Sequence, residues 1–376
     1  MQYRSFRDGT KASLLGYGCM RIPSETINGK QVSIQKEADR LLMAAFEGGI
    51  NYFDTAYPYV DGSNEAAVGR ALKPVRDQVH IATKLPINML KEKADIARIF
   101  HEQLTRLETD YIDVYLLHDM RMKYMDMFRE FGGFEFLEKA LADGKIRKIG
   151  FSSHDNNENF KKILDSYHWD MCQIQFNILD IDFQAGLDGL RYAGEKDIPV
   201  VIMEGLRGGD LANAPKAVQE IYDATGKGWS APEWGFRFVA NYAEVMTILS
   251  GMTTMEMLND NLRIFDSLTP GCVSEEDAAV YDAVRETYHK LIQVPCTTCK
   301  YCQPCPKGVT IPQIFTQFNR TTMFNNTASP RRHYGEMLKS GNAADQCVRC
   351  GLCETKCPQS IAIMDELMRA HEYFTK

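Results

Sequence analysis

The chain has 376 residues, enough for one large domain and a smaller one, and its 44% hydrophobic and 25% charged content is ordinary for a globular protein with a buried core. The formal net charge of −7 argues against a general nucleic-acid binder, because no surplus of Lys and Arg is present to neutralise phosphates. The sequence contains no run of about 18 apolar residues that would predict a membrane span, and its first residues lack the apolar stretch of a signal peptide. We therefore expect a cytoplasmic protein whose thiols stay reduced.

Short apolar segments alternate with segments of helical spacing between about residues 12 and 267. The strand-like segments are partly β-branched and almost continuously apolar, as expected for strands that are buried on both faces. They cover residues 13–19, 52–56, 80–85, 112–117, 149–152, 171–176, 199–203 and 245–249. The helix-like segments cover residues 35–47, 64–72, 95–107, 134–142, 156–164, 184–195, 231–242 and 256–265.

This alternation predicts an α/β fold of the (β/α)8 TIM-barrel type. An open doubly wound sheet is the alternative, and the lack of a Gly-rich strand-to-helix fingerprint speaks against it. The Met-rich segment 119–133 is expected to be a loop that either packs on the barrel or covers its site as an apolar lid. Because the alternation stops near residue 270, the predicted domains are 1–270 and 271–376. The second domain is expected to be small and helical, with helices at 275–294, around 311–319 and at 361–374, and a polar stretch at 325–332.

Eight of the eleven cysteines form two groups of four in this second domain. The groups read Cys296-Thr-Thr-Cys299-Lys-Tyr-Cys302-Gln-Pro-Cys305 and Cys347-Val-Arg-Cys350-Gly-Leu-Cys353-Glu-Thr-Lys-Cys357, and a proline follows each last cysteine. Three thiolates at Cys-x2-Cys-x2-Cys spacing can bind one 4Fe-4S cubane, and the cysteine before proline usually binds the other cluster when two are present. The predicted ligand sets are therefore crossed: Cys296, Cys299, Cys302 and Cys357 in one, and Cys305, Cys347, Cys350 and Cys353 in the other.

Two alternatives to an electron-carrying role stay open for these cysteines. Tetrahedral zinc needs only two Cys-x2-Cys pairs, although it does not explain triplets followed by Cys-Pro. A purely structural pair of iron–sulfur clusters is the other alternative. The first group is also one residue shorter before its last cysteine, Cys305, than the usual pattern. The helical spacer between the groups resembles a helical ferredoxin module, which implies an external electron carrier such as a ferredoxin or flavodoxin as partner.

Polar residues follow three neighbouring strands of the predicted barrel, at the end where such barrels carry their chemistry. Asp54, Tyr57 and Tyr59 follow the second strand, Lys84 ends the third and His118 ends the fourth. A Lys held beside a Tyr hydroxyl favours phenolate and so lowers the pKa of the phenol, while an Asp keeps the Lys charged. A Tyr that exchanges a proton and a His that polarises a carbonyl oxygen suit the interconversion of a carbonyl and an alcohol, with the hydride supplied by a cofactor.

Residues 1 to about 267 resemble an aldo-keto reductase. The matching motifs are Asn51-Tyr-Phe-Asp54-Thr-Ala-Tyr-Pro-Tyr59, Ser63-Asn-Glu65-Ala-Ala-Val-Gly69, Ile81-Ala-Thr-Lys84 and Asp110-Tyr-Ile-Asp-Val-Tyr-Leu-Leu-His118. In this family the catalytic Asp and Tyr are five residues apart, which selects Tyr59 over Tyr57. The resemblance thus implies a catalytic tetrad of Asp54, Tyr59, Lys84 and His118.

The same resemblance implies a nicotinamide cofactor. The implied contacts are Gly18, Cys19 and Met20 after strand one, Ser152 and Ser153 after strand five, Gln173 at the carboxamide, Glu204, Leu206, Arg207 and Gly208 after strand seven, and Ser250, Gly251, Met252, Thr253 and Asn261 at the adenosine. Residues 251–262 contain no Lys or Arg to hold a 2′-phosphate, and Arg263 is the nearest cation. Both NADPH and NADH are therefore open.

These features together predict an oxidoreductase that acts on a small-molecule carbonyl or alcohol and is coupled to, or stabilised by, two 4Fe-4S clusters. The alternative is an electron-transfer or assembly subunit whose barrel is a docking scaffold. The complete tetrad speaks against it, because a scaffold needs no such set of residues.

Overall fold

The computed structural model describes residues 1–324 and 326–376, which form two compact units. The first unit comprises Met1–Arg207 and Glu233–Ser274, and the second comprises Gly208–Pro232 and Glu275–Lys376. The predicted domain limits of 1–270 and 271–376 stay a prediction. These units differ from them chiefly because the segment Gly208–Pro232 packs with the C-terminal part of the chain.

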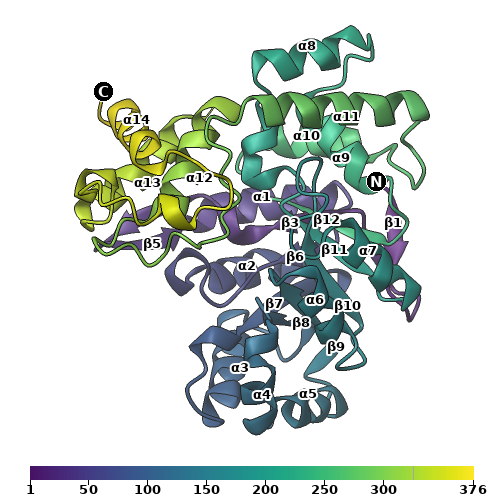
Figure 1. Cartoon of the computed structure of the whole chain (residues 1–376). Helices are drawn as coiled ribbons and strands as arrows, with labels where there is room; N and C mark the ends of the chain where they lie inside the picture. Colours follow the sequence, from purple (N-terminus) through teal and green to yellow (C-terminus); the bar gives the residue numbers. More distant parts are fainter. Residues whose placement is uncertain (325) are drawn as a thin grey trace. The chain divides into compact units, whose positions relative to one another are not determined.

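Eight parallel strands form a closed barrel in the first unit (Figure 1). The strands are β3 (Leu15–Gly18), β6 (Tyr52–Asp54), β7 (His80–Pro86), β8 (Ile112–His118), β9 (Ile146–Ser153), β10 (Met171–Gln175), β11 (Val200–Met203) and β12 (Val245–Ser250). Each strand pairs with its neighbour in chain order, and β12 closes the ring by pairing Ser250 with Tyr17 of β3. The closed ring confirms the predicted (β/α)8 barrel and excludes the open doubly wound sheet.

The barrel helices lie where the apolar spacing of the sequence predicts them. They are α1 (Gln35–Glu47), α2 (Asn64–Leu72), α3 (Ala94–Arg106), α5 (Gly133–Ala142), α6 (Asn157–Leu164), α7 (Gly186–Glu195), α9 (Ala231–Ala240) and α10 (Met255–Phe265). Asn156 caps α6 by accepting from Asn159 N at 2.9 Å, as expected of an Asn before the first turn. Gly69 lets α2 approach the end of α3, because a Cβ there would lie 2.4 Å from the Leu107 carbonyl oxygen.

The structure corrects the expectation that residues 119–133 form a loop, and it confirms the packing alternative over the lid. Met122–Glu130 is a helix, α4, whose Met125 and Phe128 are fully buried at helical i, i+3 spacing. The helical period was present in the sequence, and its apolar residues are packing residues. Two further hairpins and two further helices were not predicted. The hairpins are β1 (Tyr3–Ser5) with β2 (Lys11–Ser13) and β4 (Ser24–Ile27) with β5 (Lys30–Ser33), and the helices are α8 (Lys216–Ala224) and α13 (Ala328–Lys339).

Helices build the second unit. The predicted ones are α11 (Glu275–Lys290), α12 (Ile311–Met323) and α14 (Ile363–Thr375), and α8 and α13 add to them. Helix α13 takes up most of the polar stretch predicted at 325–332, and Asn325 itself lies outside the described residues. Apolar side chains from these helices, including Phe315, Phe318 and Leu367, form one core. Six of the eight clustered cysteines pack partly buried against it. No helix in the described ranges is long and apolar enough to cross a bilayer.

Candidate active site

Three neighbouring strands bring the four predicted catalytic residues to one end of the barrel. Asp54 is the last residue of β6, Lys84 lies in β7, and His118 ends β8. The strand register pairs Asp54 with Ala82 and Pro86 with His118. Tyr59 begins the short 3-10 segment η2 (Tyr59–Gly62) that follows β6. Because all strands run parallel, these residues gather at the carboxyl end, where barrel enzymes carry their chemistry.

Lys84 is the centre of this group. Its Nζ donates to Asp54 Oδ1 at 2.6 Å, to the Thr55 carbonyl oxygen at 2.6 Å and to Tyr59 Oη at 3.3 Å. Lys84 is only 1% exposed and Asp54 only 3%. Tyr57 is not part of the group, since its hydroxyl donates to Glu102 Oε2 at 2.6 Å. The geometry therefore favours Tyr59 over Tyr57 as the catalytic tyrosine, independently of the five-residue spacing between Asp and Tyr in the family.

The pKa values of Lys84 and Tyr59 follow the expectation from the sequence only in part. Burial lowers the pKa of the Lys84 ammonium, but the adjacent Asp54 and Tyr59 outweigh burial, so the pKa lies above its usual value and Lys84 is charged. Burial raises the pKa of the Tyr59 phenol, and Lys84 offsets only part of that rise. Lys84 lowers the pKa of the Tyr59 phenol as expected, but desolvation of the phenolate is the larger effect, so the pKa of Tyr59 lies above its usual value. Tyr59 is thus a protonated hydroxyl.

His118 is a neutral imidazole beside Tyr59. The two ring centroids are 6.0 Å apart with an interplanar angle of 85°. Burial, together with the nearby Lys84 and His154, lowers the pKa of His118 to about 3. A neutral ring can donate a hydrogen bond to a carbonyl oxygen without giving up its proton.

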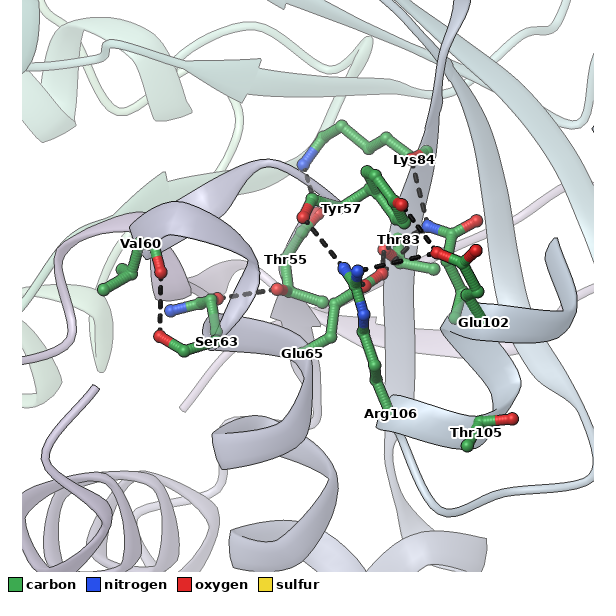
Figure 2. A network of polar contacts seen from close by, with 12 residues as sticks. Thr55, Tyr57, Val60, Ser63, Glu65, Thr83, Lys84, Glu102, Thr105 and Arg106 are labelled. Atoms are coloured by element: carbon green, nitrogen blue, oxygen red, sulfur yellow. Dashed lines mark hydrogen bonds and ion pairs between the residues drawn. The ribbon is translucent and has the colours of Figure 1, made fainter. Parts of the chain in front are cut away.

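A second layer of polar side chains holds β7 and the 57–59 segment in place (Figure 2). The fully buried Glu65 accepts from Thr83 Oγ1 at 2.6 Å and from Gln103 Nε2 at 2.8 Å. Arg106 reaches Glu65 Oε2 at 3.3 Å and the Tyr57 carbonyl oxygen at 3.2 Å. Sequence reasoning did not assign these roles. Gln103 and Arg106 lie three residues apart on α3. This spacing predicts that the two side chains share a helix face, but it does not identify the residues that they contact.

The predicted nicotinamide contacts differ in whether their side chains are already hydrogen-bonded within the protein. Gln173 in β10 is 2% exposed, and its Oε1 has no hydrogen-bond partner among residues 1–324 and 326–376. Ser152 Oγ instead accepts from Asp119 N at 2.9 Å, and Ser153 Oγ donates to the Met120 carbonyl oxygen at 2.9 Å. The two serines therefore fix the β8–α4 connection. The buried Gln173 amide is the group that fits an amide ligand, because a buried unpaired polar atom is costly.

The groups predicted at the adenosine side lie along the ends of β3 and β12. Gly18 faces Ser250, because a Cβ on it would lie 3.5 Å from the Ser250 carbonyl oxygen. Asn261 Nδ2 donates to Ser250 Oγ at 2.8 Å. The remaining predicted residues here are Cys19 and Met252, which are buried, Met20, which is exposed, and Gly251 and Thr253, which follow β12.

The chain after β11 has unusual backbone conformations. Glu204 and Arg207 have φ of 57° and 49°, in the left-handed region that non-glycine residues rarely adopt, and Gly208 has φ of 66°. Arg207 Nε lies 3.1 Å from Asp180 Oδ2. Leu206 lies between these positions, and Gly208 belongs to the second unit.

The eight clustered cysteines line two cavities in the second unit. One cavity is lined by Cys296, Cys299, Cys302 and Cys357, and the other by Cys302, Cys305, Cys347, Cys350 and Cys353. Each cavity thus contains one of the crossed sets, although the sets as ligands stay a prediction. No three His, Cys, Asp or Glu side chains in the described part of the chain lie close enough to hold a single metal ion. Four cysteines spread around a cavity are a donor set that fits a 4Fe-4S cubane.

Comparison with known proteins agrees with this architecture. Residues 14–280 match the aldo/keto reductase family, and residues 295–362 match a 4Fe-4S dicluster domain. The chain therefore belongs to the aldo/keto reductase family and carries a C-terminal ferredoxin-type domain.

The relatives include the aldo-keto reductase YhdN of Bacillus subtilis, 32% identical over 219 residues, which is 55% of this chain and 62% of that protein. Methylglyoxal reductase YeaE of Escherichia coli is 37% identical over 134 residues, 34% of this chain and 43% of that protein. The chain thus matches less than two thirds of the length of either relative.

Two solved structures have the same barrel. The holo form of the aldo-keto reductase AKR11C1 from Bacillus halodurans has a TM-score of 0.63 and 25% identity, covering 76% of this chain and 96% of that chain. An aldo-keto reductase from Klebsiella pneumoniae in complex with NADPH has a TM-score of 0.61 and 23% identity over the same shares. At the latter identity the likeness concerns the fold alone.

Proposed function

We propose that the protein interconverts a small-molecule carbonyl and its alcohol by hydride transfer with a nicotinamide cofactor. The observation that carries this proposal is the contact of Lys84 Nζ with both Asp54 Oδ1 and Tyr59 Oη, beside the neutral His118. In the reducing direction Tyr59 donates its proton to the carbonyl oxygen. Lys84 stabilises the phenolate that forms, and His118 hydrogen-bonds the same oxygen.

The bound nicotinamide would supply or accept the hydride. Within the barrel, Gln173 is the group best suited to hold its carboxamide, because Oε1 of Gln173 has no hydrogen-bond partner among the described residues. Discrimination for a 2′-phosphate is expected to be weak. Arg263, the nearest cation after β12, already pairs with Asp260 at 2.8 Å and Glu233 at 3.1 Å. We therefore expect the dissociation constants for NADH and NADPH to differ by less than about tenfold.

The cysteine domain has a separate part in this proposal. Cys296, Cys299, Cys302 and Cys357 would hold one 4Fe-4S cluster, and Cys305, Cys347, Cys350 and Cys353 the other. Such clusters exchange single electrons, whereas a hydride carries two together. We therefore propose that the cysteine domain exchanges electrons with an external one-electron carrier, such as a ferredoxin or flavodoxin, and takes no part in the hydride step.

Nucleotide binding tests this function directly. We expect anaerobically purified protein to quench its tryptophan fluorescence on titration with NADPH or NADH. Gln173→Leu should weaken binding by about tenfold, because one buried hydrogen-bonding group is lost. The melting temperature of Gln173→Leu should not fall, since the wild-type Oε1 has no partner in the described structure. Failure of the wild type to bind either nucleotide would overturn the proposal in favour of a barrel that acts as a scaffold.

A further inference from the structure

The cavity lined by Cys305, Cys347, Cys350 and Cys353 is also lined by exposed apolar side chains. Val348 is 59% exposed and Leu352 is 50% exposed, and both line this cavity. Both lie between cysteines of the second group, so they sit one or two residues from a thiol in sequence. Two large aliphatic side chains kept in solvent beside a cofactor cavity are typical of an interaction site.

Two lysines flank these apolar residues. Lys307 and Lys356 line the same cavity and are exposed, and neither is in an ion pair with any residue that the structure describes. The nearby carboxylates are used internally. Glu354 Oε1 accepts from Met364 N at 2.9 Å, and Asp365 pairs with Arg349 at 2.6 Å. We call Val348, Leu352, Lys307 and Lys356 the 307–356 patch.

The charge of the segment that carries the cysteines favours a positive face here. Residues 295–362 contain eight Lys or Arg and only three Asp or Glu, whereas the whole chain has a formal charge of −7. The segment 295–362 is therefore positive, although residues 271–376 as a whole contain twelve Lys or Arg and eleven Asp or Glu. A partner with an acidic face would be attracted to this segment.

We propose that the 307–356 patch docks a small acidic ferredoxin. The proposal rests on the function suggested above for the cysteines as cluster ligands. Val348 and Leu352 would exclude water at the centre of the contact, and Lys307 and Lys356 would pair with carboxylates at its rim. One electron would pass from the reduced ferredoxin, which is oxidised, to the 4Fe-4S cluster that Cys305, Cys347, Cys350 and Cys353 would hold. No atom or proton is transferred. A small, salt-sensitive contact suits a carrier that must leave after each electron.

Calorimetric titration of the full-length, iron-loaded protein with an oxidised acidic bacterial ferredoxin tests this docking. We expect binding that weakens as salt is raised from about 50 to about 200 mM. The double variant Lys307→Glu/Lys356→Glu should raise the Kd by at least about tenfold, and the neutral variant Lys307→Gln/Lys356→Gln by less. Leu352→Ser should weaken binding with the salt dependence unchanged. The matched control is Lys339→Glu, an exposed lysine of the same domain that lines neither cavity, which should alter the Kd by less than about twofold.

Several outcomes would overturn the proposal. These are an equal loss in Lys339→Glu, binding that is insensitive to salt, binding of a flavodoxin but not of a ferredoxin, or equally tight binding of a short DNA duplex. Nucleotide titration of the same variants separates this proposal from the hydride function. If nucleotide binding is absent but ferredoxin binding still depends on Lys307 and Lys356, the hydride function fails and the docking surface stands.

Discussion

At the residue scale, one hydroxyl is distinguished from another by its neighbours. Tyr57 and Tyr59 are two residues apart, yet only Tyr59 reaches Lys84. Tyr57 is held by Glu102 and by the Arg106 guanidinium, which lies 4.1 Å from the centre of the Tyr57 ring. Tyr57 therefore has a structural role in the second layer of the site, and Tyr59 is the one tyrosine of the pair placed for proton transfer.

The paired substitutions Tyr59→Phe and Tyr57→Phe test this distinction. Tyr59→Phe should lower the rate of carbonyl reduction by at least about 100-fold, because the proton donor is removed. Nucleotide affinity should be unchanged. Tyr57→Phe removes the same atom from a neighbouring ring and should change the rate by less than about fivefold. Both rates can be measured by nucleotide oxidation with a panel of aldehydes and ketones. Equal losses in the two variants would contradict the assignment.

At the element scale, helix α12 anchors the chain that leads into the first cysteine group. Asn319 on α12 accepts from Gln293 N at 3.1 Å and Val294 N at 2.9 Å, and its Nδ2 donates to the Val294 carbonyl oxygen at 2.8 Å. Cys296 follows two residues later. One buried side chain thus satisfies three backbone groups and fixes the start of the cysteine loop.

Replacing this side chain by an apolar one should loosen the loop. Asn319→Leu leaves the buried Val294 amide without its acceptor, which should cost about 1–3 kcal/mol in the stability of the second unit. We expect a lower melting temperature and faster iron release to a chelator. Gln313→Leu is the matched control, since Gln313 is an exposed amide side chain on the same helix. The anchoring role is wrong if Asn319→Leu releases iron no faster than Gln313→Leu.

At the scale of the whole molecule, residues far apart in the sequence complete each cysteine cavity. Cys357 joins the cavity of the first group, and Cys305 joins that of the second. The one-residue shortfall before Cys305 does not keep it from this arrangement, since Cys305 lines the second cavity. Neither cysteine group makes a four-cysteine cavity alone.

Iron counts in double variants distinguish crossed from uncrossed ligand sets. With crossed sets, Cys299→Ser/Cys357→Ser damages one site and should lose about four irons per chain, whereas Cys299→Ser/Cys305→Ser damages both and should lose about eight. With uncrossed sets the two results are exchanged. The two variants therefore serve as controls for each other. About one metal per chain and no visible colour in the wild type would instead indicate zinc.

The sequence predicted most of the elements but fewer of the contacts. All eight barrel strands and the eight helices expected after them are present, because apolar periodicity is a local property of the chain. Residues 119–133 were predicted to be a loop, and the structure shows instead that their apolar residues pack from a helix. The support by Glu65, Gln103 and Arg106 was not predicted, since it joins side chains that are about 40 residues apart.

The sequence by itself determined the order of elements, the membership of the aldo/keto reductase family, and the candidate residues Asp54, Tyr59, Lys84 and His118. Only the tertiary structure decided that Tyr59 keeps a raised pKa and that Ser152 and Ser153 bind backbone instead of remaining free. The crossed ligand sets of the cysteines were predicted from the sequence and stay a prediction, which the lining of the two cavities supports. The physical reason is that spacing along the chain fixes local conformation, whereas desolvation and hydrogen-bond partners depend on which distant segments pack together.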